Sequence, residues 1–270
     1  MHALEMDIEK EVVIGIVGGM GPQAGATLFN YIMQHTDAGT DQEHLSVVLM
    51  SLPKHIADRT AFLEGKVAVN PAVHIAKIIL DLEFLGAQVI GIACNTAHSP
   101  RIYNCIMEEL YRNNSLVKLI HMPEATCHYL KENYKWVRRV GLMSSNGTYN
   151  SNIYKDTLQE MGFEVVLPDF LFQNDIIHRM IYDPKFGIKA NTKGVTKQVH
   201  RLLEEALAFF KAQNTDAIIL GCTELSMIKD EKQTDQILLI DSTEVLAKAL
   251  IKESNVEIIS PIPVLGVKGS

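Results

Sequence analysis

Two cysteines occupy matching positions that suit acid–base chemistry. Cys94 follows the apolar run 88–92, and Cys222 follows the apolar run 216–220. Both runs are predicted as interior parallel strands, and the residues after each cysteine as the first turn of a helix. Open α/β sheets bind ligands at this strand-to-helix edge. Because the N–H groups and dipole of a helix N-terminus stabilise a thiolate, we predict two reactive thiols that face each other.

The elements that position these thiols are predicted from hydrophobic patterning. Strand-like runs alternate with helix-length segments, which predicts parallel βαβ units. The predicted strands are 12–17, 46–50, 88–93, 117–121, 139–143, 164–167, 217–220 and 237–240. The predicted helices include 22–36, 71–85, 99–113, 151–161, 192–212 and 243–252. No low-complexity segment interrupts them, so a domain boundary is expected inside a βα crossover.

Two glycine-containing strand ends precede the cysteines at nearly equal spacing. Residues 15–21 precede Cys94 and residues 141–147 precede Cys222, with equivalent positions 76 and 78 residues before the cysteine. This echo predicts two similar α/β halves related by a pseudo-twofold axis. The strand ends of both halves would then meet at one cleft, with a cysteine on each wall.

Composition limits the class of protein. The 270 residues are 47% hydrophobic and 21% charged, enough for a large buried core. The net charge of −7 argues against a nucleic-acid or anionic-membrane surface, since both partners need a basic face. No apolar run approaches a membrane span, and the four cysteines lack C-x-x-C spacing. We therefore expect a cytoplasmic globular protein with no metal site.

Four segments, in order along the chain, carry a resemblance to a known family. They are residues 16–22 (IVGGMGP), 58–60 (DRT), 94–98 (CNTAH) and 221–225 (GCTEL). Together they resemble the aspartate/glutamate racemase family, in particular its cofactor-independent aspartate racemase branch. The similarity extends over roughly residues 12–250.

The resemblance implies a fold and an assembly. It implies two similar α/β domains, each with a four-stranded parallel sheet, the active site between them, and a homodimer. Residues 1–114 together with 237–270 would form the first domain, with Cys94. Residues 115–236 would form the second, with Cys222.

The resemblance also implies a reaction: the interconversion of L- and D-aspartate, or of a related acidic amino acid such as glutamate, without a cofactor. Cys94 and Cys222 match the family's catalytic pair, in which one thiolate removes the Cα proton and the other thiol returns one to the opposite face. Arg59 matches the residue that holds the side-chain carboxylate, and Lys189 aligns with a second cationic contact. Further substrate-binding positions, on loops and at helix N-termini, are Met20, Asn95, Thr96, Ser145, Asn146, Thr148 and Thr223.

Other interpretations of these residues remain open. Residues 19–24 satisfy the dinucleotide-binding pattern G-x-G-x-x-A, but the second predicted strand ends without the acidic residue that this pattern expects. The same fold could serve a maleate isomerase, a decarboxylase or a catalytically silent protein that binds acidic amino acids. His98 could orient a thiolate or simply pack, and Glu224 could be a first-turn acid favoured by the helix dipole.

Overall fold

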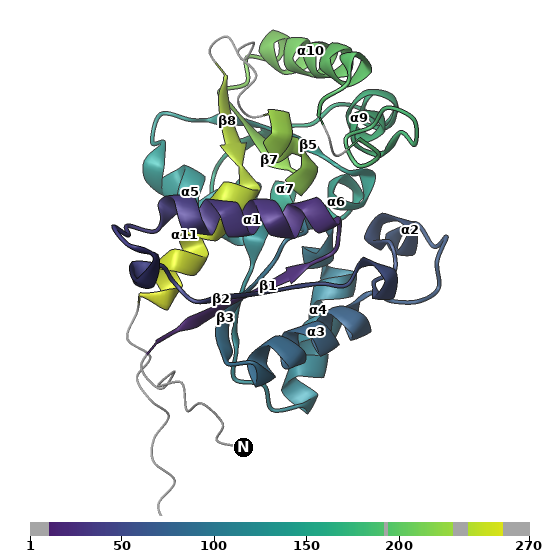
Figure 1. The fold of residues 1–270 in the computed structure, drawn as a ribbon. Coiled ribbons are helices and arrows are strands. Elements are labelled where there is room, and N and C mark those ends of the chain that lie inside the picture. The colour runs from purple at the N-terminus through teal and green to yellow at the C-terminus, as the bar shows by residue number, and fades with distance from the viewer. Residues whose placement is uncertain (1–10, 192–193, 229–236, 256–270) are drawn as a thin grey trace, which may run out of the picture.

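Two four-stranded parallel sheets form the frame of the molecule (Figure 1). The computed structural model describes residues 11–191, 194–228 and 237–255. The first sheet has the order β2-β1-β3-β4 and the second the order β6-β5-β7-β8. The strands of the first sheet are β1 (Val13–Gly18), β2 (Val47–Ser51), β3 (Ala87–Ile92) and β4 (Lys118–Ile120). The strands of the second sheet are β5 (Arg139–Ser144), β6 (Glu164–Val166), β7 (Ala217–Gly221) and β8 (Leu238–Asp241). The predicted α/β class and the repeated half are confirmed, and each strand lies within two residues of its predicted position.

Helices connect and cover these strands. They are α1 (Pro22–His35), α2 (Arg59–Leu63), α3 (Ala72–Phe84), α4 (Pro100–Arg112), α5 (Met122–Asn133), α6 (Asn146–Asn150), α7 (Ile153–Glu160), α8 (Phe170–Phe172), α9 (Arg179–Tyr182), α10 (Lys197–Ala212) and α11 (Ser242–Ser254). Short 3₁₀ segments are η2 (Asp41–Glu43), η3 (Pro53–His55), η4 (Asn95–His98) and η6 (Thr223–Ile228), and η5 (Gln173–His178) is a π-helical turn. The first two residues of the predicted helix 192–212 lie outside the described residues, and α10 begins at Lys197.

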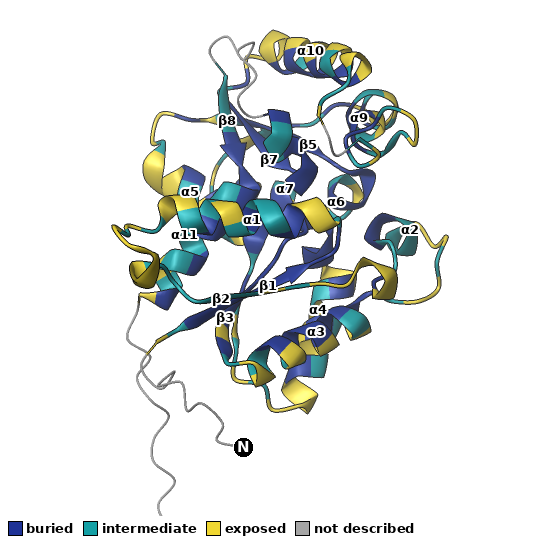
Figure 2. Ribbon diagram, viewed as in Figure 1, coloured by how far each residue is buried: buried dark blue, intermediate teal, exposed yellow. Residues whose placement is uncertain are grey.

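Each sheet is buried on both faces, as the continuous apolar runs predicted. In the first domain, α3 and α4 cover one face and α1 and α11 the other. In the second domain, α9 and α10 cover one face and α5 and α7 the other. Figure 2 shows the central strands β1 and β7 buried, while the helices expose their outer faces and the edge strand β2 is partly exposed. The strand ends are therefore held rigidly where they enter the space between the domains.

Two strands pair differently from the predicted division of the chain. β4 (118–120), assigned to the second domain, pairs with β3 in the first sheet, and β8 (238–241), assigned to the first domain, pairs with β7 in the second. A crossover through a helix places the next strand beside the one it left, which explains both pairings. The chain returns to the first domain at α11 and not at β8, since α11 packs on α1 and within the core of the first domain.

The two domains touch closely at α6. A Cβ atom on Gly147 would lie 2.6 Å from Thr96 Cγ2 and 2.7 Å from Thr60 Oγ1, both in the first domain. Only a residue without a side chain permits this approach. The contact lies beside the segment that contains Cys94.

Candidate active site

Cys94 and Cys222 stand at equivalent strand ends of the two sheets. Cys94 follows β3 and precedes η4, and Cys222 follows β7 and precedes η6. The thiols are 6% and 7% exposed, and each belongs to the apolar core of its own domain. An electrostatic interaction with Cys94 contributes to raising the pKa of Cys222, so the two thiols lie within electrostatic range of each other.

Cys222 is held in its protonated form. Its thiol donates a hydrogen bond to Glu224 Oε2 at 3.0 Å. Burial raises the pKa of the Cys222 thiol well above its ordinary value, the negative charge of Glu224 raises it further, and Lys189 partly opposes both effects. The expected stabilisation of a thiolate by a helix N-terminus is wrong for Cys222. The short segment η6 provides a weak dipole, and burial together with the adjacent carboxylate outweighs it.

Glu224 is an ionised carboxylate despite its burial. Its Oε1 accepts hydrogen bonds from Lys189 Nζ at 2.5 Å and from the backbone N–H of Gly21 at 3.2 Å. Its Oε2 accepts from the Thr223 hydroxyl at 3.2 Å as well as from Cys222. Burial alone would raise the pKa of Glu224, but the charge and hydrogen bond of Lys189 lower it. Conversely, burial opposes the charge of Lys189, and Glu224 raises the pKa of that ammonium.

Arg59 supplies a second buried cation from the opposite domain. It is the first residue of α2, whose N-terminus is capped by Asp58 accepting from the Ala61 N–H at 2.7 Å. The guanidinium donates to the carbonyls of Met20 at 3.1 Å and Ala57 at 3.2 Å. Within the described part of the chain, its Nε is buried and has no hydrogen-bond partner. A planar cation with a free donor can bind a carboxylate.

The charge of Arg59 is balanced by groups of the site. Burial opposes this charge, but interaction with Cys94, followed by Tyr182 and Asp58, raises the pKa of the guanidinium. Arg59 therefore lies within electrostatic range of the Cys94 thiol.

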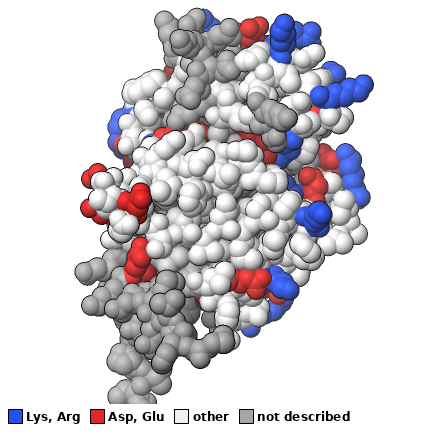
Figure 3. Space-filling view, viewed as in Figure 1, with Lys and Arg blue, Asp and Glu red and all other residues white. Residues whose placement is uncertain are grey.

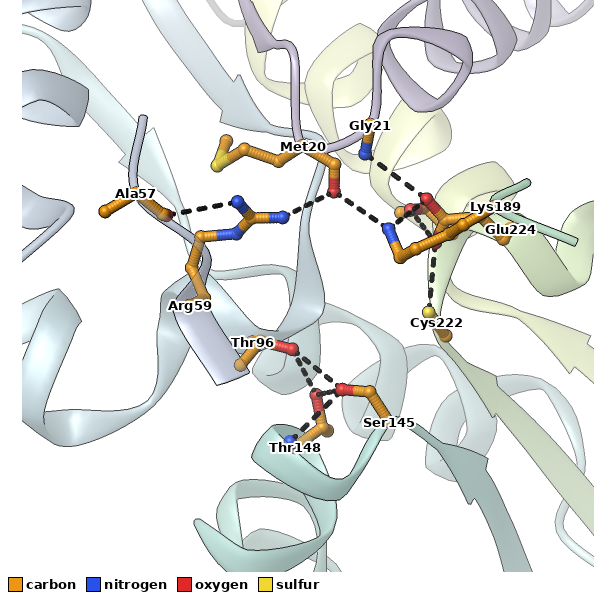
Figure 4. A network of polar contacts seen from close by, with 11 residues as sticks. Met20, Gly21, Ala57, Arg59, Thr96, Ser145, Thr148, Lys189, Cys222 and Glu224 are labelled. Atoms are coloured by element: carbon orange, nitrogen blue, oxygen red, sulfur yellow. Dashed lines mark hydrogen bonds and ion pairs between the residues drawn. The ribbon is translucent and has the colours of Figure 1, made fainter. Parts of the chain in front are cut away.

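The Met20 carbonyl lies between the two cations (Figure 4). It accepts from Arg59 and, at 3.5 Å, from Lys189 Nζ. The Met20 side chain is 2% exposed and packs in the core of the first domain. Met20 thus contributes its backbone to the site.

Three hydroxyl groups, one from the first domain and two from the second, meet in one cluster (Figure 4). Thr96 Oγ1 lies 3.0 Å from Ser145 Oγ and 2.9 Å from Thr148 Oγ1. All three are buried, and Ser145 also caps α6. These hydroxyls and the adjacent first-turn N–H groups form a polar floor that can hold an anion.

Two predicted substrate-binding side chains are engaged elsewhere. The Asn95 amide donates to Ser242 Oγ at 3.1 Å, and its oxygen accepts from the Tyr154 hydroxyl at 2.5 Å. The Asn146 amide donates to Asn174 Oδ1 at 2.9 Å and accepts from Gln173. These hydrogen bonds hold both side chains against neighbouring segments of the site.

A cavity of about 450 Å³ adjoins the ion pair of Lys189 and Glu224. Its walls include the start of α1, together with Ile188, Thr223 and Met227. Figure 3 shows acidic and basic atoms side by side in the furrow between α1 and the second domain. Among the described residues, no group of three or more His, Cys, Asp or Glu could hold a metal ion.

Sequence reasoning missed Tyr182 and left Glu224 and His98 undecided. Tyr182 interacts electrostatically with Lys189, Cys222 and Arg59, but it stands in no recognisable motif. His98 is buried, and its Nδ1 hydrogen-bonds to the Cys94 carbonyl at 2.9 Å. Burial lowers the pKa of His98 to about 3, so the ring is neutral and braces the strand end.

Each α/β domain places a buried thiol at the end of a strand, and the two thiols interact electrostatically. A profile of the Asp/Glu/hydantoin racemase family matches residues 17–250. The chain therefore belongs to this family. It is an amino-acid racemase in class, and hence an isomerase.

Individual relatives agree with this assignment. The chain is 28% identical over 249 residues to the broad specificity amino-acid racemase RacX of Bacillus subtilis, covering 88% of this chain and 96% of the relative. The Picrophilus torridus aspartate racemase has a TM-score of 0.73 at 32% identity, covering 90% of this chain and 94% of that one. The Francisella tularensis glutamate racemase, solved with D-glutamate, shares the fold with a TM-score of 0.60 at 21% identity, covering 91% of this chain and 81% of that one. No helix in the described ranges is both long and apolar enough to cross a membrane.

Proposed function

We propose that this enzyme interconverts the L- and D-forms of aspartate, or of a related acidic amino acid such as glutamate, by a two-thiol mechanism without a cofactor. The observation that carries the proposal is the pair of buried thiols at equivalent strand ends, one beside a carboxylate and the other beside a guanidinium. Removing a Cα proton from one face and returning it to the other needs one base and one acid. Burial and the neighbouring carboxylate of Glu224 raise the pKa of Cys222, which suits this thiol to the role of the acid.

The residues divide the work as follows. Cys94 as thiolate, paired with Arg59, removes the Cα proton, and Cys222 as thiol donates its proton to the opposite face. The two roles exchange when the other enantiomer reacts. Negative charge that develops on the α-carboxylate is met by the hydroxyls and N–H groups of the polar floor.

The preference for an acidic side chain is supported by Arg59. Its buried Nε has no partner in the described part of the chain, so a substrate carboxylate would satisfy a donor that is otherwise unpaired. The 32% identity to an aspartate racemase along nearly the whole chain supports the same substrate.

Exchange in heavy water tests the proposal. The purified protein is incubated with L-aspartate, L-glutamate or maleate under reducing conditions without added cofactor. We expect aspartate or glutamate to approach an equal mixture of enantiomers, with deuterium at Cα, as measured by chiral chromatography and mass spectrometry. Retention of handedness and of the α-proton in both amino acids would refute it, and conversion of maleate would identify an isomerase of another kind.

A further inference from the structure

The Met20–Gly21 peptide of the first domain is hydrogen-bonded to both members of an ion pair in the second domain. The carbonyl of Met20 accepts from Lys189 Nζ, and the N–H of Gly21 donates to Glu224 Oε1. Lys189 and Glu224 are themselves hydrogen-bonded. These contacts join α1's N-terminal loop to the second domain (Figure 4).

The two oxygens of Glu224 have different partners. Oε1 accepts from Lys189 and Gly21, and Oε2 accepts from the thiol of Cys222. With Thr223 as the fourth donor, every acceptor position of the carboxylate is filled. If the domains separated, Glu224 would lose the Gly21 N–H, and water would compete with the thiol for the carboxylate.

We propose that Glu224 is a positioning residue that couples closure of the cleft to presentation of the Cys222 thiol. It binds the Met20–Gly21 peptide with one oxygen and fixes the thiol proton with the other. The inference rests on the proposed function and deepens it, since it makes the position of the Cys222 thiol, the acid of the reaction, depend on closure of the domains. The charged and titratable groups that face Cys222 are Glu224, Lys189, Cys94 and Tyr182.

Glu224→Gln tests the electrostatic half of the proposal. Loss of the anion lets Cys222 lose its proton at lower pH, so the alkaline limb of the pH profile of kcat/KM moves to lower pH. We expect kcat/KM at the optimum to fall about 10- to 100-fold. Glu224→Asp retains the charge and should keep the alkaline limb near that of the wild type. Glu253→Gln, which breaks an ion pair with Lys118 far from the cleft, is the matched control.

A second readout does not depend on racemisation. Alkylation of Cys222 by iodoacetamide at pH 7.5, followed by peptide mass spectrometry, reports the thiolate fraction and access to the cleft. We expect Glu224→Gln to accelerate it about tenfold or more. If the wild type racemised neither aspartate nor glutamate, the proposed function would fail, while this comparison would still decide the role of Glu224.

Gly21 tests the coupling itself. Gly21→Pro removes the N–H that binds Glu224, whereas Gly21→Ala keeps it, and a Cβ at this position meets only Glu224 Oε1 at 3.6 Å. Gly21→Pro should raise KM and accelerate alkylation of Cys222 relative to Gly21→Ala. Equal alkylation rates in these two variants, or an unshifted alkaline limb in folded Glu224→Gln, would overturn the proposal. Circular dichroism establishes that each variant is folded.

Discussion

Cys94 and Cys222 are the same chemical group in opposite electrostatic settings. Glu224 receives a hydrogen bond from one thiol, and Arg59 interacts with the other. Two identical thiols in symmetric surroundings would share their protons evenly. The unequal neighbours instead make Cys222, which donates to Glu224, the proton donor in the proposed mechanism.

Replacing either cysteine by serine tests its part in proton transfer. A hydroxyl is a far weaker acid than a thiol, so racemisation by Cys94→Ser or Cys222→Ser should fall about 10²- to 10⁴-fold. The measurement is the initial rate of chiral inversion. Cys105→Ser, at a half-buried position on α4, should remain at the wild-type rate. Full activity in either catalytic variant would exclude that residue from the mechanism.

Arg59→Lys separates the role of the guanidinium from that of its charge. A lysine ammonium keeps the charge but cannot form two parallel bonds, so KM for aspartate should rise about 10- to 100-fold. Steady-state kinetics provide the measurement. Arg101→Lys is the control, because Arg101 is exposed and donates to the Leu63 carbonyl. An unchanged KM in Arg59→Lys would argue against direct carboxylate binding.

At this scale, the sequence identified residue types better than their contacts. The thiols, Arg59 and Lys189 could be proposed from motifs and resemblance. The side chains of Asn95 and Asn146 could not be placed, because their partners are set by tertiary packing and Ser242 lies 147 positions from Asn95. The role of Glu224 was hidden for the same reason, since Gly21 is 203 positions away.

Among the elements, two short helices position residues of the candidate site. α2 and α6 have five residues each, yet α2 positions Arg59 and α6 brings Ser145 and Thr148 to Thr96. Strands and long helices were predictable because their apolar periodicity is sustained over many residues. A five-residue helix has no such period, and only its cap, Asp58 or Ser145, marks it in the sequence.

Gly147→Ala tests the contact between α6 and the first domain. The added methyl group would overlap Thr96 and Thr60, so it must push the domains apart. We expect a loss of about 1–3 kcal/mol in the free energy of unfolding, together with reduced kcat/KM. Urea denaturation and steady-state kinetics measure the two effects. Gly39→Ala, at an exposed site near the flexible end of Glu43, should change neither, and a fully active, stable Gly147→Ala would refute the close fit.

For the whole molecule, buried His98 makes stability depend on pH. Its pKa is about 3 in the folded protein because of burial, against an ordinary value of 6.5. Between these values the unfolded chain binds a proton that the folded chain does not. Stability therefore decreases as pH falls from 6.5 toward 3, with a contribution of about 1.4 kcal/mol per pH unit.

Chemical denaturation at several pH values checks this dependence. His98→Gln should flatten the decline between pH 6.5 and 4.5, because the group that gains a proton on unfolding is gone. His128→Gln, at an exposed position on α5, should leave the slope as in the wild type. An identical slope in His98→Gln would assign the acid sensitivity to other groups.

The chain passes between the domains twice, from β4 to β5 through α5 and from β8 directly into α11. Two adjacent covalent connections define a hinge: they allow rotation of the domains about one axis and oppose sliding or twisting. The hydroxyl of Tyr31 on α1 stabilises the connection from β8 to α11 by donating a hydrogen bond to Asp241 at 2.8 Å. Two adjacent connections restrict the relative movement of the domains more than one would, which favours a constant alignment of Cys94 and Cys222 in the proposed reaction.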